Sequence, residues 1–175
     1  MLKYDWTIDE VRAVYSQPFP DLMYQAQTTH RARFQAGVVH RSTLCSVKTG
    51  GCSEDCAYCS QSAHNSTDLE RHALLPKDEV LRLAREAKEE GSGRFCLGAA
   101  WSRVRDNGEF EQILDLIRAV NAIGLQCCCT LGMLTYEQAV RLKEAGCYGY
   151  NHNLDTSPEF YPRIITTRTY EDRLE

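Results

Sequence analysis

At 175 residues the chain is long enough for one domain with a hydrophobic core and too short for two of ordinary size. Its 43% hydrophobic and 25% charged residues are typical of a globular protein, and no apolar run approaches the roughly 20 residues that a membrane helix needs. The net charge is −4 and the basic residues form no cluster, which argues against nucleic acid as a partner.

The first 40 residues predict an N-terminal helical extension. Thr7 and Glu10 have the spacing of a capping box, which begins a short helix that ends before Pro18. A second helix is expected from Pro20 to about Phe34. The first residues include no apolar stretch like that of a secretory signal, so we expect a cytoplasmic protein.

From residue 41 to residue 175, short strands alternate with helices of about three turns. The expected strands cover residues 41–47, 95–101, 125–131 and 148–154. The expected helices cover residues 77–90, 110–123 and 135–145, and a last helix begins at residue 169. This alternation predicts an α/β fold with a parallel sheet, and four βα units are half of a TIM-type barrel of eight.

A parallel sheet of four strands with helices on one face leaves its other face and both edges uncovered. The last expected helix is also cut short by the end of the chain. We therefore expect residues 41–175 to be part of a longer barrel, in a truncated chain or a fragment.

Nine cysteines are unusual for such a chain. Without an export signal they should stay reduced, so metal or cluster binding is favoured over disulfides, with buried structural thiols as the alternative. Cys52, Cys56 and Cys59 have CxxxCxxC spacing in a glycine-led loop after the first strand. Three thiolates can hold three irons of a cubane cluster and leave the fourth iron open for a chelating substrate.

A zinc site is the alternative for these cysteines, with His64 or Cys45 as its fourth ligand. Zinc motifs usually come as two paired CxxC units, and no second pair follows here. Otherwise Cys45 and Cys147 are expected to be structural thiols.

The cysteine loop resembles the CxxxCxΦC motif of the radical S-adenosylmethionine (SAM) superfamily, with Tyr58 as the aromatic residue. The resemblance implies that Cys52, Cys56 and Cys59 hold a [4Fe–4S] cluster whose open iron is chelated by SAM, and that Tyr58 lies beside the adenine. One electron from the cluster then cleaves SAM to methionine and a 5′-deoxyadenosyl radical. Because the cofactor does this chemistry, no side chain is expected to be catalytic.

Longer segments resemble the biotin synthase family within that superfamily. They are residues 42–52, 95–101, 130–132, 150–157 and 164–170. The resemblance implies radical insertion of sulfur into dethiobiotin, with a reducing electron donor such as flavodoxin and a possible homodimer. It also implies a [2Fe–2S] cluster held by three cysteines and an arginine, of which only Cys96 and Cys128 map onto this chain.

Strand alternation supports these two ligands, because successive side chains point to opposite faces. Cys96 shares a face with Gly98, whereas Cys128 faces opposite to Cys127 and Cys129. We expect small residues and one thiol per strand to face the barrel interior, and their neighbours to lie under the helices.

The fourth expected strand places Asn151, Asn153 and Asp155 on one face, converging at its C-terminal end. A carboxylate that accepts ribose hydroxyls is familiar from dinucleotide sites. By resemblance, Asn153 and Asp155 contact the SAM ribose and Asn151 binds the ureido ring of dethiobiotin.

The backbone of Gly98, Ala99 and Ala100 is expected to meet the methionine end of SAM. Lys48 is expected near the substrate, with a solvated loop lysine as the alternative. Two other functions stay open: a related SAM enzyme of cofactor biosynthesis that lacks the second cluster, and a non-catalytic iron–sulfur or zinc-binding fragment.

Overall fold

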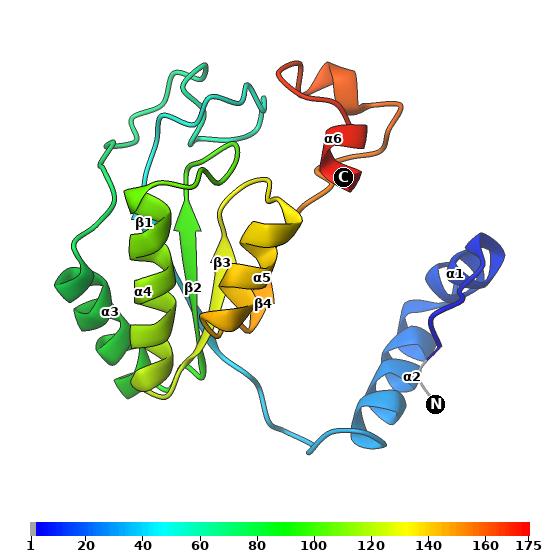
Figure 1. Ribbon diagram of the computed structural model, residues 1–175. Coiled ribbons are helices and arrows are strands. Elements are labelled where there is room, and N and C mark those ends of the chain that lie inside the picture. Colours follow the sequence, from blue (N-terminus) through cyan, green and yellow to red (C-terminus); the bar gives the residue numbers. More distant parts are fainter. Residues whose placement is uncertain (1–2) are drawn as a thin grey trace. The chain divides into compact units, whose positions relative to one another are not determined.

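The computed structural model describes residues 3–175. The chain divides into two compact units, Met1–Val39 and His40–Glu175. The first unit contains α1 (Ile8–Tyr15) and α2 (Phe19–Arg31) (Figure 1). The predicted capping box is confirmed, because Thr7 and Glu10 exchange side-chain and backbone hydrogen bonds at the start of α1.

The second unit is built on a parallel sheet whose strands follow one another in chain order. Its strands are β1 (Ser42–Lys48), β2 (Arg94–Ala99), β3 (Gln126–Thr130) and β4 (Gly149–Tyr150). Its helices are α3 (Lys77–Glu89), α4 (Gly108–Ala122), α5 (Tyr136–Glu144), the short 3₁₀ helix η1 (Tyr161–Arg163) and α6 (Glu171–Leu174). The predicted α/β fold with a four-stranded parallel sheet is confirmed, as part of a TIM-type arrangement.

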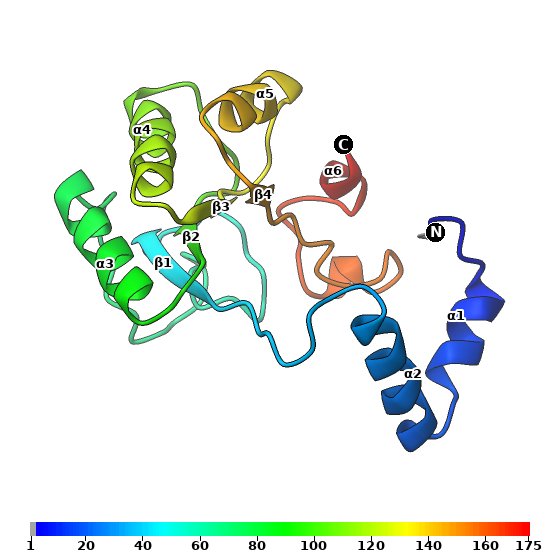
Figure 2. The same ribbon diagram turned by 90° about the horizontal axis from the view of Figure 1, so that it is seen from below.

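Helices α3, α4 and α5 all lie against the same face of the sheet (Figure 2). The core forms between this face and the helices, where Phe95, Leu97, Cys127 and Cys129 are buried. Their contacts include an apolar row on α4, made of Phe110, Ile113, Leu116, Ile117 and Val120. On the opposite face Leu44 of β1 is 70% exposed, whereas Cys128 of β3 is buried.

The fourth strand is shorter than predicted. An extended segment over residues 148–154 was expected, but β4 covers Gly149–Tyr150 only. Its ladder partners in β3 are Cys128 and Cys129, and the last ladder bond runs from the Asn151 N–H to the Cys129 carbonyl (2.8 Å). Because β3 ends at Thr130, the residues that follow Asn151 have no partner strand there and leave the sheet.

The described helices include none that is both long enough and apolar enough to cross a bilayer. All nine cysteines lie within residues 3–175 and are free thiols.

Candidate metal centre

The three cysteines of the CxxxCxxC motif lie on one closed loop at the C-terminal end of β1. Gly50 and Gly51, with φ angles of 73° and 74°, lead the chain into this loop through the left-handed region that glycine adopts most readily. Backbone bonds then close it: the Cys52 N–H donates to the Gln61 carbonyl (3.0 Å) and the Ala63 N–H to the Cys52 carbonyl (2.8 Å). The turn holds the motif at the strand edge where (βα) barrels place their ligands.

Cys59 influences the other two thiols of the motif electrostatically. Burial raises the pKa values of the Cys52 and Cys56 thiols, and the neighbouring Cys59 contributes to both increases. Among residues 3–175, no group of three His, Cys, Asp or Glu side chains surrounds a single-ion position. A cubane cluster binds each thiolate through a different iron, whereas zinc needs four donors on one ion, so the donor set fits the cluster better.

Cys45 and His64 were the two residues expected as the fourth ligand of a zinc site. Cys45 lies in the core on the helix-covered face, away from the loop. The ring of His64 is hydrogen-bonded to the Ser53 carbonyl (3.1 Å). The structure therefore places Cys45 in the core, whereas His64 lies within the loop and bonds to Ser53 through Nε2 only.

The loop is tied to a segment that lies more than 100 residues further along the chain. The carboxylate of Asp55 accepts the backbone N–H groups of Thr166 (2.9 Å) and Thr167 (3.2 Å). The Ala57 N–H donates to the Ile164 carbonyl (2.9 Å). Hydrogen bonds, first among them that from the Thr166 hydroxyl, hold the pKa of Asp55 well below its usual range. These bonds fix the position of the backbone around Cys56.

Arg168 lies beneath the loop, with its side chain 6% exposed. Its guanidinium pairs with Glu54 (3.1 Å) and Asp155 (2.9 Å) and donates to the Cys56 Sγ atom (3.4 Å). Sequence patterns gave no sign of this role, since Cys56 is 112 positions away and the residues around Arg168 have no periodicity. Its buried carboxylate partners, Glu54 and Asp155, are brought to Arg168 only by the fold.

The Asp155 side chain is buried in this same network and is 3% exposed. It accepts the Tyr58 hydroxyl (2.6 Å), and its backbone takes a left-handed φ of 68°. Burial by itself would raise the pKa of Asp155, but hydrogen bonds from Tyr58 and Arg168 lower it. The structure thus joins the predicted cofactor residues Tyr58 and Asp155 directly.

The predicted alignment of Asn151, Asn153 and Asp155 on one strand face is wrong. The strand ends at Tyr150, and the left-handed residue Asp155 turns its carboxylate toward the cysteine loop. Asn151 is exposed and donates to the Thr130 hydroxyl (3.2 Å), and Asn153 is exposed as well.

Cys96 and Cys128 are direct neighbours across β2 and β3. Burial, followed by the effect of Cys96, raises the pKa of the Cys128 thiol to about 11. Gly149 is the partner of Cys128 on β4, where an added Cβ would lie 3.5 Å from the Cys128 Sγ atom. The predicted facing is confirmed, because Cys127 and Cys129 belong to the helix-side core and Cys128 does not.

A cavity of about 280 Å³ adjoins the cysteine loop at the ends of β1 and β2. Lys48, Gly51 and Ala100 are among its lining residues. The Ala100 N–H donates to the Lys48 carbonyl (2.9 Å), and the Ala99 carbonyl accepts from Trp101 (2.8 Å). Gly98 is paired within the ladder of β2. The three residues predicted for the methionine end of SAM, Gly98, Ala99 and Ala100, therefore lie at the strand end beside the loop. The Ala100 N–H and the Ala99 carbonyl are already hydrogen-bonded within the chain.

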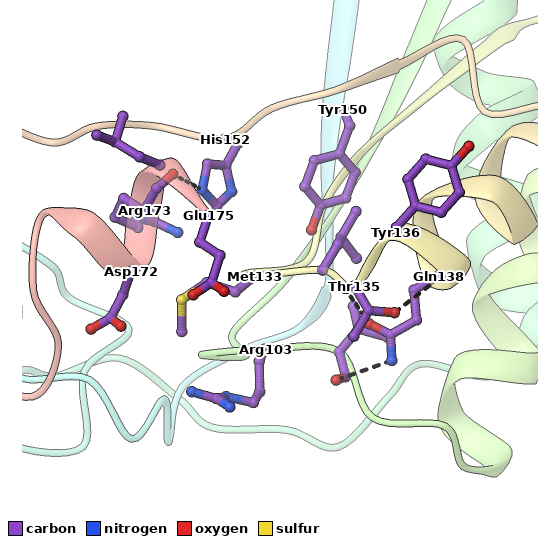
Figure 3. Close-up of a pocket in the computed structure, with 13 residues that line it drawn as sticks. Arg103, Met133, Thr135, Tyr136, Gln138, Tyr150, His152, Asp172, Arg173 and Glu175 are labelled. Atoms are coloured by element: carbon purple, nitrogen blue, oxygen red, sulfur yellow. Dashed lines mark hydrogen bonds between the residues drawn. The ribbon is translucent and has the colours of Figure 1, made fainter.

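A larger cavity, of about 630 Å³, lies between the ends of β3 and β4 and helix α6 (Figure 3). Arg103, Arg173 and His152 are among its lining residues, and the His152 ring is hydrogen-bonded to the Arg173 carbonyl (2.9 Å). This cavity was not predicted, because nothing in the sequence indicates that α6 lies near these strand ends.

The sequence model of the Radical SAM superfamily matches residues 46–175. Three curated proteins similar to the chain carry the name biotin synthase: those of Cytophaga hutchinsonii (53% identity), Nostoc punctiforme (52%) and Paraburkholderia xenovorans (57%). The alignments cover 99%, 99% and 97% of this chain and 52%, 52% and 47% of the relatives. The chain therefore spans about half the length of the curated relatives it matches.

Proposed function

The chain belongs to the radical SAM superfamily, and on this premise we propose that it is part of a biotin synthase, which inserts sulfur into dethiobiotin. The observation that carries the proposal is the closed loop of Cys52, Cys56 and Cys59 at the C-terminal end of β1. The relatives named biotin synthase support the choice of reaction within the superfamily.

In this proposal Cys52, Cys56 and Cys59 hold a [4Fe–4S] cluster. When bound, the cluster supplies the electron that cleaves SAM and starts the radical chemistry. Tyr58 is 63% exposed, and its hydroxyl is held by Asp155, so the ring is fixed at one end and free to contact the adenine. The residues themselves bind and orient the cofactor.

The neighbouring residues complete the binding site. Asn153 and Asp155 are proposed to contact the SAM ribose, and Asn151 the ureido ring of dethiobiotin. For Asp155 this requires its buried carboxylate to exchange a bond to Tyr58 or Arg168 for a ribose hydroxyl. The backbone of Gly98, Ala99 and Ala100 is proposed for the methionine end of SAM. The cavity that Lys48 and Ala100 line beside the cysteine loop supports a binding role for this strand edge.

Cys96 and Cys128 are proposed as two ligands of a [2Fe–2S] cluster that donates the sulfur. Their adjacent positions on the open face of the sheet support this role and favour it over a related SAM enzyme without the second cluster. The family resemblance also supports a reducing electron donor such as flavodoxin and a homodimer. Nine free thiols suit a reducing compartment, and we propose the cytoplasm.

Anaerobic reconstitution with iron and sulfide, followed by EPR of the reduced chain, tests the proposal. We expect an iron–sulfur protein whose [4Fe–4S] signal changes when SAM is added, because an open iron accepts the new ligand. Zinc near one atom per chain without visible absorbance would support a zinc-binding fragment instead. A cluster signal that is blind to SAM would contradict the enzyme function.

A further inference from the structure

Arg168 uses all three nitrogens of its guanidinium group, and two of its four partners, Glu54 and Cys56, lie on the cysteine loop. Its Nε atom donates to the Tyr161 hydroxyl (2.9 Å), one terminal nitrogen pairs with Glu54, and the other donates to Asp155 and to the Cys56 Sγ atom. The planar, always charged guanidinium has five donors and can serve these partners simultaneously. Lysine has a single side-chain nitrogen and cannot reproduce this forked set of hydrogen bonds.

The position of Arg168 is fixed by its partners rather than by Cys56. Glu54 and Asp155 are buried carboxylates, so Arg168 neutralises them and would cost stability if it were removed. A second arginine, Arg173, lies 3.4 Å from Asp155. The contact with Cys56 is therefore made by a positive group that the surrounding network already holds in place.

We propose that Arg168 is a positioning residue that holds the Cys56 sulfur and raises the reduction potential of the cluster bound there. The inference rests on the proposed function, because it requires a cluster on Cys56. Reduction adds one negative charge to a cluster. An N–H···S hydrogen bond from a buried cation stabilises that added charge, and hydrogen bonds to ligand sulfurs are among the factors that set cluster potentials.

The test is a redox titration of the reconstituted full chain, with the amplitude of the reduced-cluster EPR signal as the readout. In Arg168→Met we expect the reduced-to-oxidised ratio at a fixed potential to fall about tenfold, equivalent to ~59 mV for a one-electron couple. Arg168→Lys keeps the charge but loses the fork, so a smaller shift in the same direction is expected. Arg163→Met is the matched control, because Arg163 lies in the same segment, is exposed, and stacks on Phe160.

An intact cluster at the wild-type potential in both Arg168 variants would overturn the proposal. If Arg168→Met fails to fold, Arg168→Lys decides alone, because it retains a buried cation for Glu54 and Asp155. A wild-type potential in that variant would then exclude the forked guanidinium geometry as a determinant, and the hydrogen-exchange comparison below would decide the positioning role.

A wild-type chain that binds no cluster would count against the proposed function, and the tie between Arg168 and the loop is then tested without metal. Hydrogen exchange of the Asp55 and Ala57 amides, which bond to Thr167 and Ile164, should be faster in the Arg168 variants than in Arg163→Met. Equal exchange rates would overturn the positioning role as well.

Discussion

Replacing Cys59 with alanine is expected to abolish binding of the [4Fe–4S] cluster. Cys59 is half-buried and is one of only three thiols on the loop, so its loss leaves two irons without protein ligands. The replaced group is small and lies outside the main core, so the fold should persist. Iron and sulfide content after anaerobic reconstitution, together with the SAM-dependent EPR change, should both fall to background.

Cys45→Ala is the matched control, because Cys45 is also a free thiol but lies within β1, in the core between the sheet and the helices. This variant should keep the wild-type iron content and lose only a modest amount of stability. Full iron in Cys59→Ala, or loss of metal in Cys45→Ala, would contradict the assignment. The second result would point to the zinc site in which Cys45 is a ligand.

Replacing Gly132 with alanine is expected to lower the free energy of unfolding by more than about 3 kcal/mol. Gly132 has a φ of 87°, and an added Cβ would lie 2.5 Å from the Trp101 carbonyl oxygen and 2.6 Å from the Ser102 backbone. The left-handed conformation alone costs about 1–2 kcal/mol for a residue with a Cβ. The clash with rigid backbone adds to this, because it separates the two loops that the Met133–Ser102 hydrogen bond (3.0 Å) joins.

Gly124→Ala separates the two contributions. Gly124 has a φ of 90°, but its nearest neighbour is the flexible tip of Lys88, at 3.2 Å. Only the conformational cost should appear there, about 1–2 kcal/mol. Urea unfolding of both variants measures the difference, and equal losses would show that the contact with the Trp101 loop contributes nothing.

Sequence patterns correctly predicted those helices and strands that depend on interactions between residues close together in the chain. The helix expected over residues 77–90 is found at Lys77–Glu89, ending before a glycine with a φ of 90°. The strand expected over residues 125–131 is found at Gln126–Thr130, and its alternation correctly separated Cys128 from the core thiols. The membership in the superfamily and the similarity to biotin synthase, predicted from motif residues, are confirmed by the comparisons.

The parts that sequence reasoning missed depend on contacts between distant residues. The length of β4 is limited by where β3 ends, which its own residues do not encode. The direction of the Asp155 carboxylate follows from its left-handed backbone, a conformation that Gly, Asn and Asp adopt readily but that their presence in a sequence does not specify. Arg168 and Arg173 had no sequence signal, because their partners come from elsewhere in the chain.

The bonds between Asp55 and residues 166–167 have a consequence for biosynthesis. The cysteine motif leaves the ribosome well before its distant partners, since Asp55 and Thr167 are separated by 112 positions. At a synthesis rate of about 5–20 residues per second, that interval is roughly 6–20 seconds. During that time the nascent loop has no partner for the Asp55 carboxylate or the Cys56 sulfur. The loop can acquire its final conformation only after the segment with Arg168 has been translated, so metal loading onto the folded site is a late event.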